Sequence, residues 1–338
     1  MTRRKLLLLG LGAIVCLGVG FAIYGLLPPR PVSGRTAVSV RLKWLHQAQF
    51  AGFYVAKEKG FYESEGLDVT LNAGGVDFPA VQMVAGGGED FGVTAADQIL
   101  LARDKGVPVV ALAVIYRKSP MVYFSLKDSG ITKLQDFVGK RAGVKLGGNE
   151  ELTYRAMIRK AGIDPKSVNE VVIKYDISPL LQGKVDVWPG YAINEPIVAE
   201  ERGFPVNLIW PSDYGVSLYA DTVFATEKTI AERPEIVQKF VRATVRGWQY
   251  AIEHPDEAVQ CTLTYGEKLD AGHETRMMEA SIPLVKPDDA PVGSMDKDTW
   301  AGMAQLLLEQ NFMKKPINVD EAFTQRFISG PQATATTK

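Results

Sequence analysis

The stretch that decides the fold is residues 38–71, VSVRLKWLHQAQFAGFYVAKEKGFYESEGLDVTL. Residues 38–42 alternate apolar and polar side chains, which predicts a β-strand. Residues 50–59 carry an apolar face and stop at Gly60, which predicts a helix. Residues 67–71 alternate again. A strand, a helix and a second strand in this order predict a βαβ unit with parallel strands.

The same alternation continues outward along the chain. Further strands are expected over residues 91–93, 107–115, 142–145, 171–174, 185–188 and 206–210, and helices over 78–84, 96–105, 150–161, 179–182 and 194–202. The pattern restarts after Gly130, and from residue 227 onward it becomes mainly helical. Strands that alternate with helices predict mostly parallel sheets covered by helices on both faces. The sequence therefore predicts two α/β units and a helical C-terminal block.

Two units of this kind predict two lobes joined by crossing strands. The apolar, β-prone runs at residues 121–126 and 221–226 flank the second unit and are the expected crossings. The predicted division is an N-terminal segment, a discontinuous lobe 1, a lobe 2 and a disordered tail, over residues 1–35, 36–124 with 224–330, 125–223, and 331–338, respectively. A ligand site is expected between the lobes, at the carboxyl ends of the strands.

The first 35 residues differ from the rest of the chain. They hold five of the 38 basic residues and none of the 39 acidic ones. A basic start is followed by an uncharged run over residues 6–27 and then by Pro28 and Pro29. This layout predicts a secretory signal peptide or a retained membrane anchor, with the body of the protein outside the cytoplasmic membrane.

The rest of the chain carries 33 basic and 39 acidic residues, a net charge of −6. This mildly acidic balance argues against nucleic acid as a partner. Cys261 is the one cysteine after residue 35, so no disulfide can form within the body. The three histidines stand far apart and share no metal-ligand spacing, which argues against a metal site.

Two glycine-rich turns are candidate phosphate cradles. Residues 86–88 follow a predicted helix rather than a strand, so they are interpreted as an ordinary turn. Gly147 and Gly148 follow a strand and precede a helix, where backbone N–H groups could hold a polar ligand group. Glu150 stands in the first helical turn and would repel an anion. An ordinary helix start and a ligand cradle both remain open.

Two aromatic stretches are candidate ligand contacts. Residues 188–196, WPGYAINEP, place Trp188 and Tyr191 around an expected Pro-Gly turn, with Asn194 and Glu195 opening a helix. Aromatic faces beside a carboxylate suit a flat ring that bears N–H donors. Residues 44–49, WLHQAQ, are expected to face the same cleft, with Trp44 and Gln49 as contacts.

Nine segments together resemble one family. They are KWLHQAQFAGFYVAKEKGFY at 43–62, EGLDV at 65–69, DFGV at 90–93, GVPVV at 106–110, SLKDSGI at 125–131, GKVD at 183–186, NEP at 194–196, DYGV at 213–216 and YAIEHP at 250–255. The chain is similar here to the substrate-binding proteins of ABC importers in the thiamine-pyrimidine, nitrate and alkanesulfonate group. The likeness runs from about residue 38 to residue 327.

The resemblance implies a two-lobed periplasmic-binding-protein fold of the type II, Venus flytrap kind. It also implies a non-enzymatic receptor that hands a small molecule, such as the pyrimidine hydroxymethylpyrimidine or its amino analogue, to a permease and its ATPase, with no cofactor. Phe50 stands where pyrimidine-binding relatives carry a histidine, so a flavin, another small solute of the family such as a sulfonate or nitrate, or a pyrimidine-synthesising enzyme remains an alternative. The expected ligand-binding residues are Trp44, Gln49, Phe50, Asp97, Gly147, Gly148, Glu150, Trp188, Tyr191, Asn194 and Glu195.

Overall fold

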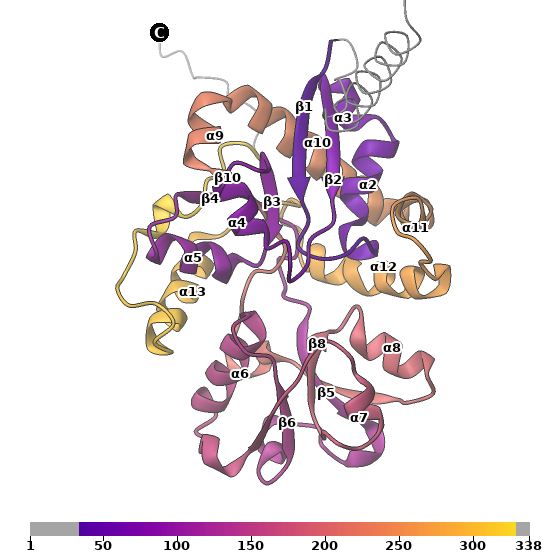
Figure 1. Ribbon diagram of the computed structural model, residues 1–338, viewed down its shortest axis with the longest axis vertical. Coiled ribbons are helices and arrows are strands. Elements are labelled where there is room, and N and C mark those ends of the chain that lie inside the picture. The colour runs from indigo at the N-terminus through magenta and orange to yellow at the C-terminus, as the bar shows by residue number, and fades with distance from the viewer. Residues whose placement is uncertain (1–33, 329–338) are drawn as a thin grey trace, which may run out of the picture.

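The computed structural model describes residues 34–328, which form two lobes stacked one above the other in Figure 1. We call the part built on a five-stranded sheet lobe 1 and the part built on the two smaller sheets lobe 2. The two-lobed α/β architecture predicted from the sequence is confirmed. The expected N-terminal signal or anchor and the expected tail over residues 331–338 lie outside the described residues.

Lobe 1 contains a sheet whose strand order departs from chain order. Its strands, from one edge to the other, are β2 (Leu67–Asn72), β1 (Thr36–Arg41), β3 (Phe91–Thr94), β10 (Thr222–Thr226) and β4 (Val109–Val114). β1 is parallel to β2 and β3, whereas β10 is antiparallel to both β3 and β4. A strand from the far end of the chain therefore fills the gap between β3 and β4.

Lobe 2 is built on two small sheets. One has the order β8 (Trp188–Tyr191), β5 (Met121–Leu126), β9 (Val206–Ile209), and the other pairs β6 (Arg141–Val144) with β7 (Asn169–Val172). A parallel bridge between Ala142 and Val187 joins the two sheets. The Pro-Gly turn expected after Trp188 is not formed, because Pro189 and Gly190 are paired with β5 inside β8.

Helices cover these sheets. In lobe 1 they are η1 (Ala48–Phe50), α2 (Ala51–Glu58), α3 (Phe61–Ser64), α4 (Ala80–Ala85), α5 (Ala96–Asp104), α9 (Glu227–Glu232), α10 (Pro234–Glu253), α11 (Pro255–Leu263), α12 (Ala271–Val285), α13 (Lys297–Glu309) and η6 (Val319–Glu321). In lobe 2 they are η2 (Lys127–Ser129), η3 (Leu134–Phe137), α6 (Asn149–Lys160), η4 (Pro165–Ser167), α7 (Ser178–Leu181), α8 (Glu195–Glu201) and η5 (Pro211–Tyr214). No helix within residues 34–328 is long and apolar enough to cross a membrane.

The core of lobe 1 depends on a close approach between α2 and α10. α10 buries residues at helical spacing, which include Phe240 and Trp248. A Cβ on Gly247 would lie 2.2 Å from the carbonyl oxygen of Gly52, and a Cβ on Gly52 would lie 2.2 Å from the ring of Trp248. These two glycines therefore set the distance between the helices.

The chain passes between the lobes twice. β5 is hydrogen-bonded within the lobe 2 sheet and β10 within the lobe 1 sheet. The connections thus run just before these strands, over residues 115–120 and 215–221, rather than along the strands as the sequence suggested. The physical reason is that both strands are apolar because they are buried inside a sheet, which the sequence alone does not distinguish from a crossing.

Candidate functional site

A cleft of about 450 Å³ lies between the lobes. Its lobe 1 wall comes from the loop after β1, from η1, from α4 and from the end of β3 with the start of α5. Its lobe 2 wall comes from the loops after β6 and β7, the end of β8 and the first residues of α6 and α8. This volume falls in the range of about 300–1,000 Å³ that is usual for small-molecule sites.

Most of the residues expected from the sequence meet at this cleft. Those that line it are Trp44, Gln49, Gly147, Gly148, Glu150, Tyr191, Asn194 and Glu195. They come from both lobes and from segments that are far apart in the sequence. Their role as ligand contacts stays a prediction.

Three of the expected residues do not line the cleft. Phe50 is fully buried in the core of lobe 1, and Trp188 is fully buried in a lobe 2 cluster that includes Phe124. Trp188 and Tyr191 lie three residues apart in one strand, so their side chains point to opposite faces of the sheet. Asp97 is fully buried at the start of α5 and accepts a hydrogen bond from Gln98 at 2.7 Å.

Lys43 links the two lobes on the inner side of the cleft. Its ammonium lies 4.5 Å from the centre of the Tyr191 ring, is hydrogen-bonded to the Tyr191 hydroxyl, and lies 3.6 Å from the Asp221 carboxylate. Burial lowers the pKa of Lys43, but the Tyr191 hydroxyl and the Asp221 carboxylate outweigh it and raise that pKa above its ordinary value. Lys43 is therefore a charged ammonium at neutral pH.

The Asp221 carboxyl completes this inner group. Its Oδ2 accepts a hydrogen bond from Gln49 at 2.6 Å. Burial raises the pKa of Asp221, and the Lys43 ammonium opposes that rise. Burial also raises the pKa of Tyr191 to about 12, so its hydroxyl stays protonated and can donate to a ligand.

Lys145 forms a second charged group on the lobe 2 wall. Its ammonium lies 3.6 Å from Glu150 and 3.7 Å from Glu195, and 4.6 Å from the centre of the Tyr175 ring. Glu195 also accepts a hydrogen bond from the Tyr191 N–H at 2.8 Å. The wall therefore offers an ammonium and two carboxylates to one ligand.

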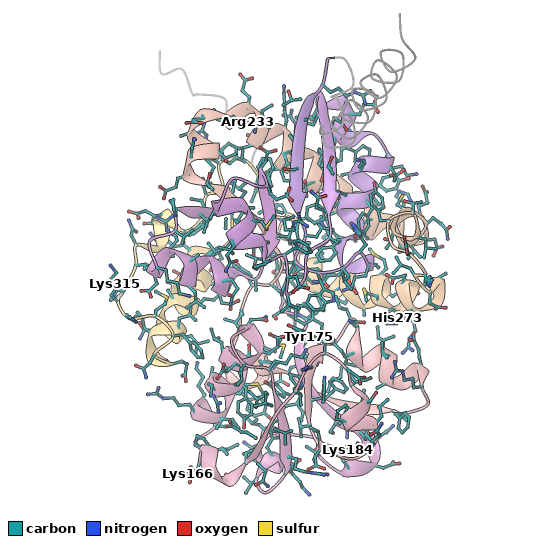
Figure 2. The ribbon with its side chains drawn as sticks, in the orientation of Figure 1. Lys166, Tyr175, Lys184, Arg233, His273 and Lys315 are labelled. Atoms are coloured by element: carbon teal, nitrogen blue, oxygen red, sulfur yellow. The ribbon has the colours of Figure 1, made fainter. Side chains whose placement is uncertain are left out.

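The mouth of the cleft is bridged by aromatic rings. Trp44 of lobe 1 and Tyr175 of lobe 2 lie with ring centres 4.7 Å apart at an angle of 44°. Tyr175 lies where the two lobes meet in Figure 2, and it is 46% exposed, so it stands at the entrance rather than in a core. A flat ligand that enters the cleft must pass this pair.

The turn before α6 is occupied by a carboxylate of the protein itself. Glu151 accepts a hydrogen bond from the Gly147 N–H at 2.9 Å, and Gly147 adopts a φ of +84°, which favours glycine. A Cβ on Gly148 would lie 2.7 Å from the Glu150 carboxylate. These contacts agree with the interpretation of Gly147 and Gly148 as a helix start, since an anion there would have to displace Glu151.

The sequence analysis missed three polar or aromatic residues of the cleft: Lys43, Lys145 and Tyr175. A signal for them was present, because each stands at or just after the carboxyl end of a predicted strand. That edge of a sheet is where ligands bind in open α/β folds. In the part of the chain that the structure describes, no cluster of three His, Cys, Asp or Glu residues could hold a metal ion.

Curated proteins similar to this chain have names of two kinds. The riboflavin-binding protein RibY of Chloroflexus aurantiacus is 27% identical, over 87% of this chain and 86% of its own length. The formylaminopyrimidine-binding protein of Halalkalibacterium halodurans is 26% identical, over 85% and 89%. A 4-amino-5-hydroxymethyl-2-methylpyrimidine phosphate synthase of Legionella pneumophila is 24% identical, over 87% and 93%.

A solved structure confirms the fold. The periplasmic aliphatic sulphonate binding protein SsuA of Escherichia coli superposes with a TM-score of 0.67 at 14% identity, over 86% of this chain and 92% of that one. The chain thus has the periplasmic-binding-protein fold. The family model described as NMT1/THI5 like matches residues 47–258, more than half of the chain. The chain therefore belongs to the NMT1/THI5-like family.

Proposed function

We propose that the protein is the extracytoplasmic substrate-binding protein of an ABC importer and captures a flat heteroaromatic vitamin precursor in the interlobe cleft. The observation that carries the proposal is the composition of this cleft. Aromatic rings from both lobes lie beside ammonium and carboxylate groups of both lobes. Ring faces suit a flat ligand, and charges of both signs suit a ring whose edge carries both donors and acceptors.

A thiamine pyrimidine, such as hydroxymethylpyrimidine or its amino analogue, meets these requirements. Its exocyclic amine can donate to Glu150 or Glu195, and its ring nitrogens can accept from Lys43, Lys145 or the Tyr191 hydroxyl. The formylaminopyrimidine-binding relative supports this ligand class. The internal pairing of Glu151 with the Gly147 N–H argues against a sulfonate or nitrate in that turn.

Riboflavin is the second candidate, and the size of the cleft favours it. A single substituted ring would leave much of the 450 Å³ to water. The additional space is lined by aliphatic residues of α4, α5 and the adjoining loops: Val76, Pro79, Val81, Leu101 and Val107. The riboflavin-binding relative supports this alternative.

The state of Lys43 supports binding rather than catalysis. An amine that forms a Schiff base must be neutral when it attacks. The pKa of Lys43 is raised by Tyr191 and Asp221 although burial acts to lower it, so its ammonium is ready to donate hydrogen bonds instead. A synthase on this scaffold is the alternative, and mixing the protein with pyridoxal phosphate tests it: a Schiff-base absorbance band would support the enzyme.

Calorimetric titration tests the proposed function. The probes are hydroxymethylpyrimidine, its amino analogue, formylaminopyrimidine, riboflavin, an alkanesulfonate and nitrate. Saturable binding of one of the heteroaromatic compounds, with no binding of the two anions, is the expected result. Binding of the anions alone would overturn the proposal.

A further inference from the structure

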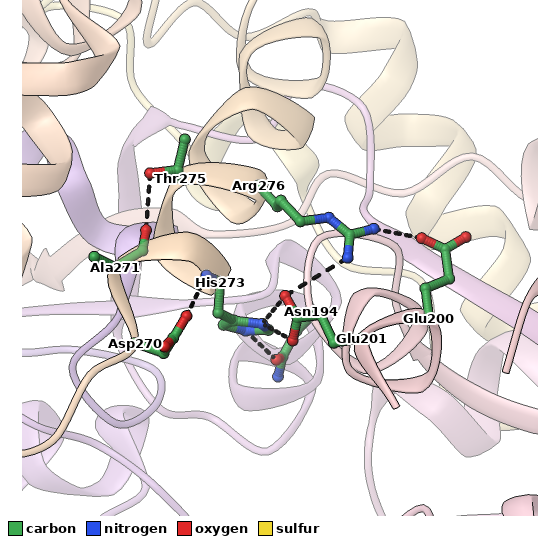
Figure 3. Close-up of polar contacts among 8 residues, drawn as sticks. All are labelled: Asn194, Glu200, Glu201, Asp270, Ala271, His273, Thr275 and Arg276. Atoms are coloured by element: carbon green, nitrogen blue, oxygen red, sulfur yellow. Dashed lines mark hydrogen bonds and ion pairs between the residues drawn. The ribbon is translucent and has the colours of Figure 1, made fainter. Parts of the chain in front are cut away.

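A cluster of polar contacts joins α8 of lobe 2 to α12 of lobe 1 beside the cleft, as Figure 3 shows. His273 lies in the first turn of α12, where its backbone N–H is capped by Asp270 at 2.9 Å. Its ring Nδ1 lies 3.0 Å from Oε2 of Glu201, and its ring Nε2 lies 3.2 Å from Oδ1 of Asn194. Asn194 also lines the cleft. One imidazole therefore touches both a charged partner and a cleft residue.

The chemistry of these partners constrains the proton positions. A carboxylate accepts hydrogen bonds, so Nδ1 of His273 must carry a proton to bond to Glu201. The Oδ1 atom of Asn194 is also an acceptor, so its contact requires a second proton on Nε2. The observed arrangement is thus that of a doubly protonated, charged imidazole.

A neutral imidazole requires the opposite arrangement at Asn194. With its one proton kept on Nδ1 for Glu201, the ring offers Nε2 as an acceptor. The Asn194 amide then has to present Nδ2 to His273. Oxygen and NH₂ are nearly the same size, so half a turn of the amide exchanges them without repacking. Nδ2 points away from the imidazole in Figure 3, and half a turn would bring Oδ1 to that side.

We propose that His273 determines which end of the Asn194 amide faces the cleft. When His273 is charged, Asn194 offers the cleft an N–H donor; when His273 is neutral, Asn194 offers a carbonyl acceptor. His273 is then a positioning residue for ligand selection. The effect on ligands rests on the proposed function, whereas the coupling between His273 and Asn194 does not.

Charges around His273 come from both helices that hold it. Glu200 and Glu201 stand on α8, and Asp270 and Glu274 belong to the start of α12. Arg276 is the neighbouring cation: it pairs with Glu200 and lies 3.6 Å from Glu201.

The turn η1 also packs against α12, and its residues Ala48–Phe50 carry no charge. Because carboxylates outnumber the arginine, the surroundings favour a proton on His273 at mildly acidic pH. Histidine side chains change charge between about pH 5 and 8.

The consequence is a selectivity that changes with pH. At pH 8 the Oδ1 of Asn194 faces the cleft and favours a ligand with an exocyclic amine. At pH 5.5 the Nδ2 of Asn194 faces the cleft and favours a ligand with a carbonyl oxygen at the same ring position. The preference for the amino ligand over the oxo ligand should therefore grow as pH rises.

The first experiment needs no ligand. The side-chain amide of Asn194 is observed by ¹⁵N NMR and assigned by its loss in Asn194→Asp. From pH 5 to 8 its signals should shift together with those of the His273 ring nitrogens. The shift should disappear in His273→Gln and persist in the matched control His254→Gln, since His254 packs on Tyr250 away from the cleft. An Asn194 signal that ignores the His273 titration overturns the inference.

The second experiment measures the dissociation constants of aminohydroxymethylpyrimidine and its 4-oxo counterpart at pH 5.5 and 8. The ratio of the two constants should change with pH by about five- to tenfold more in the wild type than in His273→Gln, the effect of about one hydrogen bond. Protonation of the ligands themselves is common to both proteins and cancels in this comparison. Equal changes in both proteins overturn the inference. If neither compound binds, the proposed function fails for this ligand class, and the NMR titration still decides the coupling.

Discussion

Glu195 stands where β8 gives way to α8 and has two partners there. Its Oε2 accepts the Tyr191 N–H at 2.8 Å, and its Oε1 lies 3.7 Å from the ammonium of Lys145. A Cβ on Gly190 would come within 3.0 Å of the Glu195 side chain, so glycine is needed at that position. Glu195 thus holds the turn with one oxygen and offers its charge to the cleft.

Replacing Glu195 by Gln should weaken ligand binding without unfolding lobe 2. An amide oxygen can still accept the Tyr191 N–H, but the charge that would meet a ring amine is lost. We expect affinity to fall by about tenfold to a hundredfold, because a hydrogen bond to a charged group is worth about 1.5–3 kcal/mol. Calorimetric titration beside the exposed control Glu253→Gln measures this. Wild-type affinity in Glu195→Gln would remove Glu195 from the site.

Asp97 makes a different prediction, about stability. It is fully buried and its Oδ1 has no hydrogen-bond partner among the described residues. Burial raises the pKa of Asp97, so the folded state holds the proton more tightly than the unfolded state does. The contribution of Asp97 to stability is therefore lost as pH rises above about 4, the ordinary range for Asp.

Asp97→Asn should escape this loss. We expect its free energy of unfolding at pH 8 to exceed that of the wild type by about 1 kcal/mol, with a smaller gain at pH 3.5. Urea unfolding at both pH values measures it, with the exposed Asp77→Asn as a control. A destabilised Asp97→Asn would mean that the charge is needed beside Lys43.

Residue types and their spacing predicted part of the cleft. Trp44, Tyr191 and Glu195 were found because aromatic and acidic residues follow predicted strands. Trp188 was misplaced because Pro189 and Gly190 were interpreted as a turn, although an edge position in a sheet tolerates proline. The partners of Lys43 could not be found from sequence, since Asp221 and Tyr191 reach it only through the folding of both lobes.

At the level of elements, the contact between α2 and α10 carries the clearest prediction. Gly247 lies inside α10, and a Cβ there would come within 2.2 Å of a backbone oxygen in α2. Gly302 lies inside α13, and a Cβ there would meet nothing within 4 Å. The two glycines have the same helical setting but opposite surroundings.

Gly247→Ala should destabilise the protein by about 1–3 kcal/mol, since it overpacks a fixed interface. Gly302→Ala should stabilise it by about 0.5–1 kcal/mol, since alanine is the better helix former. Chemical denaturation of both variants measures the difference. Equal effects of the same sign would show that α2 and α10 can move apart.

Sequence periodicity predicted most of the strands and helices to within a few residues. It did so because each amphipathic element carries its own pattern of burial. It did not reveal that β10 lies between β3 and β4, since pairing across the chain leaves no local signal. It also placed the crossings on β5 and β10 instead of just before them.

At the scale of the whole molecule, the contacts between Trp44 and Tyr175 and between Lys43 and Tyr191 hold the cleft closed. A ligand can enter only when these contacts open. We expect the lobes to move apart about residues 115–120 and 215–221 and to close on ligand as rigid bodies. Small-angle scattering should show a radius of gyration that falls at saturating ligand and stays constant with a non-binding compound. An unchanged radius with bound ligand would indicate a static pocket.

The predicted export signal or anchor makes a separate prediction. Arg3, Arg4 and Lys5 precede the apolar run, which should place the body on the outer side of the cytoplasmic membrane. Alkaline phosphatase fused after Lys338 should therefore be active. Replacing the three basic residues by Asp should lower that activity at equal expression. A stable but inactive wild-type fusion would contradict the predicted location.

The position of β10 in the lobe 1 sheet also bears on the order of folding. β4 ends at Val114, but the strand that fills the gap beside it begins at Thr222 (Figure 1). While the chain is being made, β3 and β4 are left with unpaired edges until all of lobe 2 has followed. Such late, long-range pairing slows folding. Lobe 2 is continuous in sequence and can fold first. A chain that delays its own central sheet stays unfolded long enough to be threaded through a membrane pore, and until then it depends on chaperones to cover those edges.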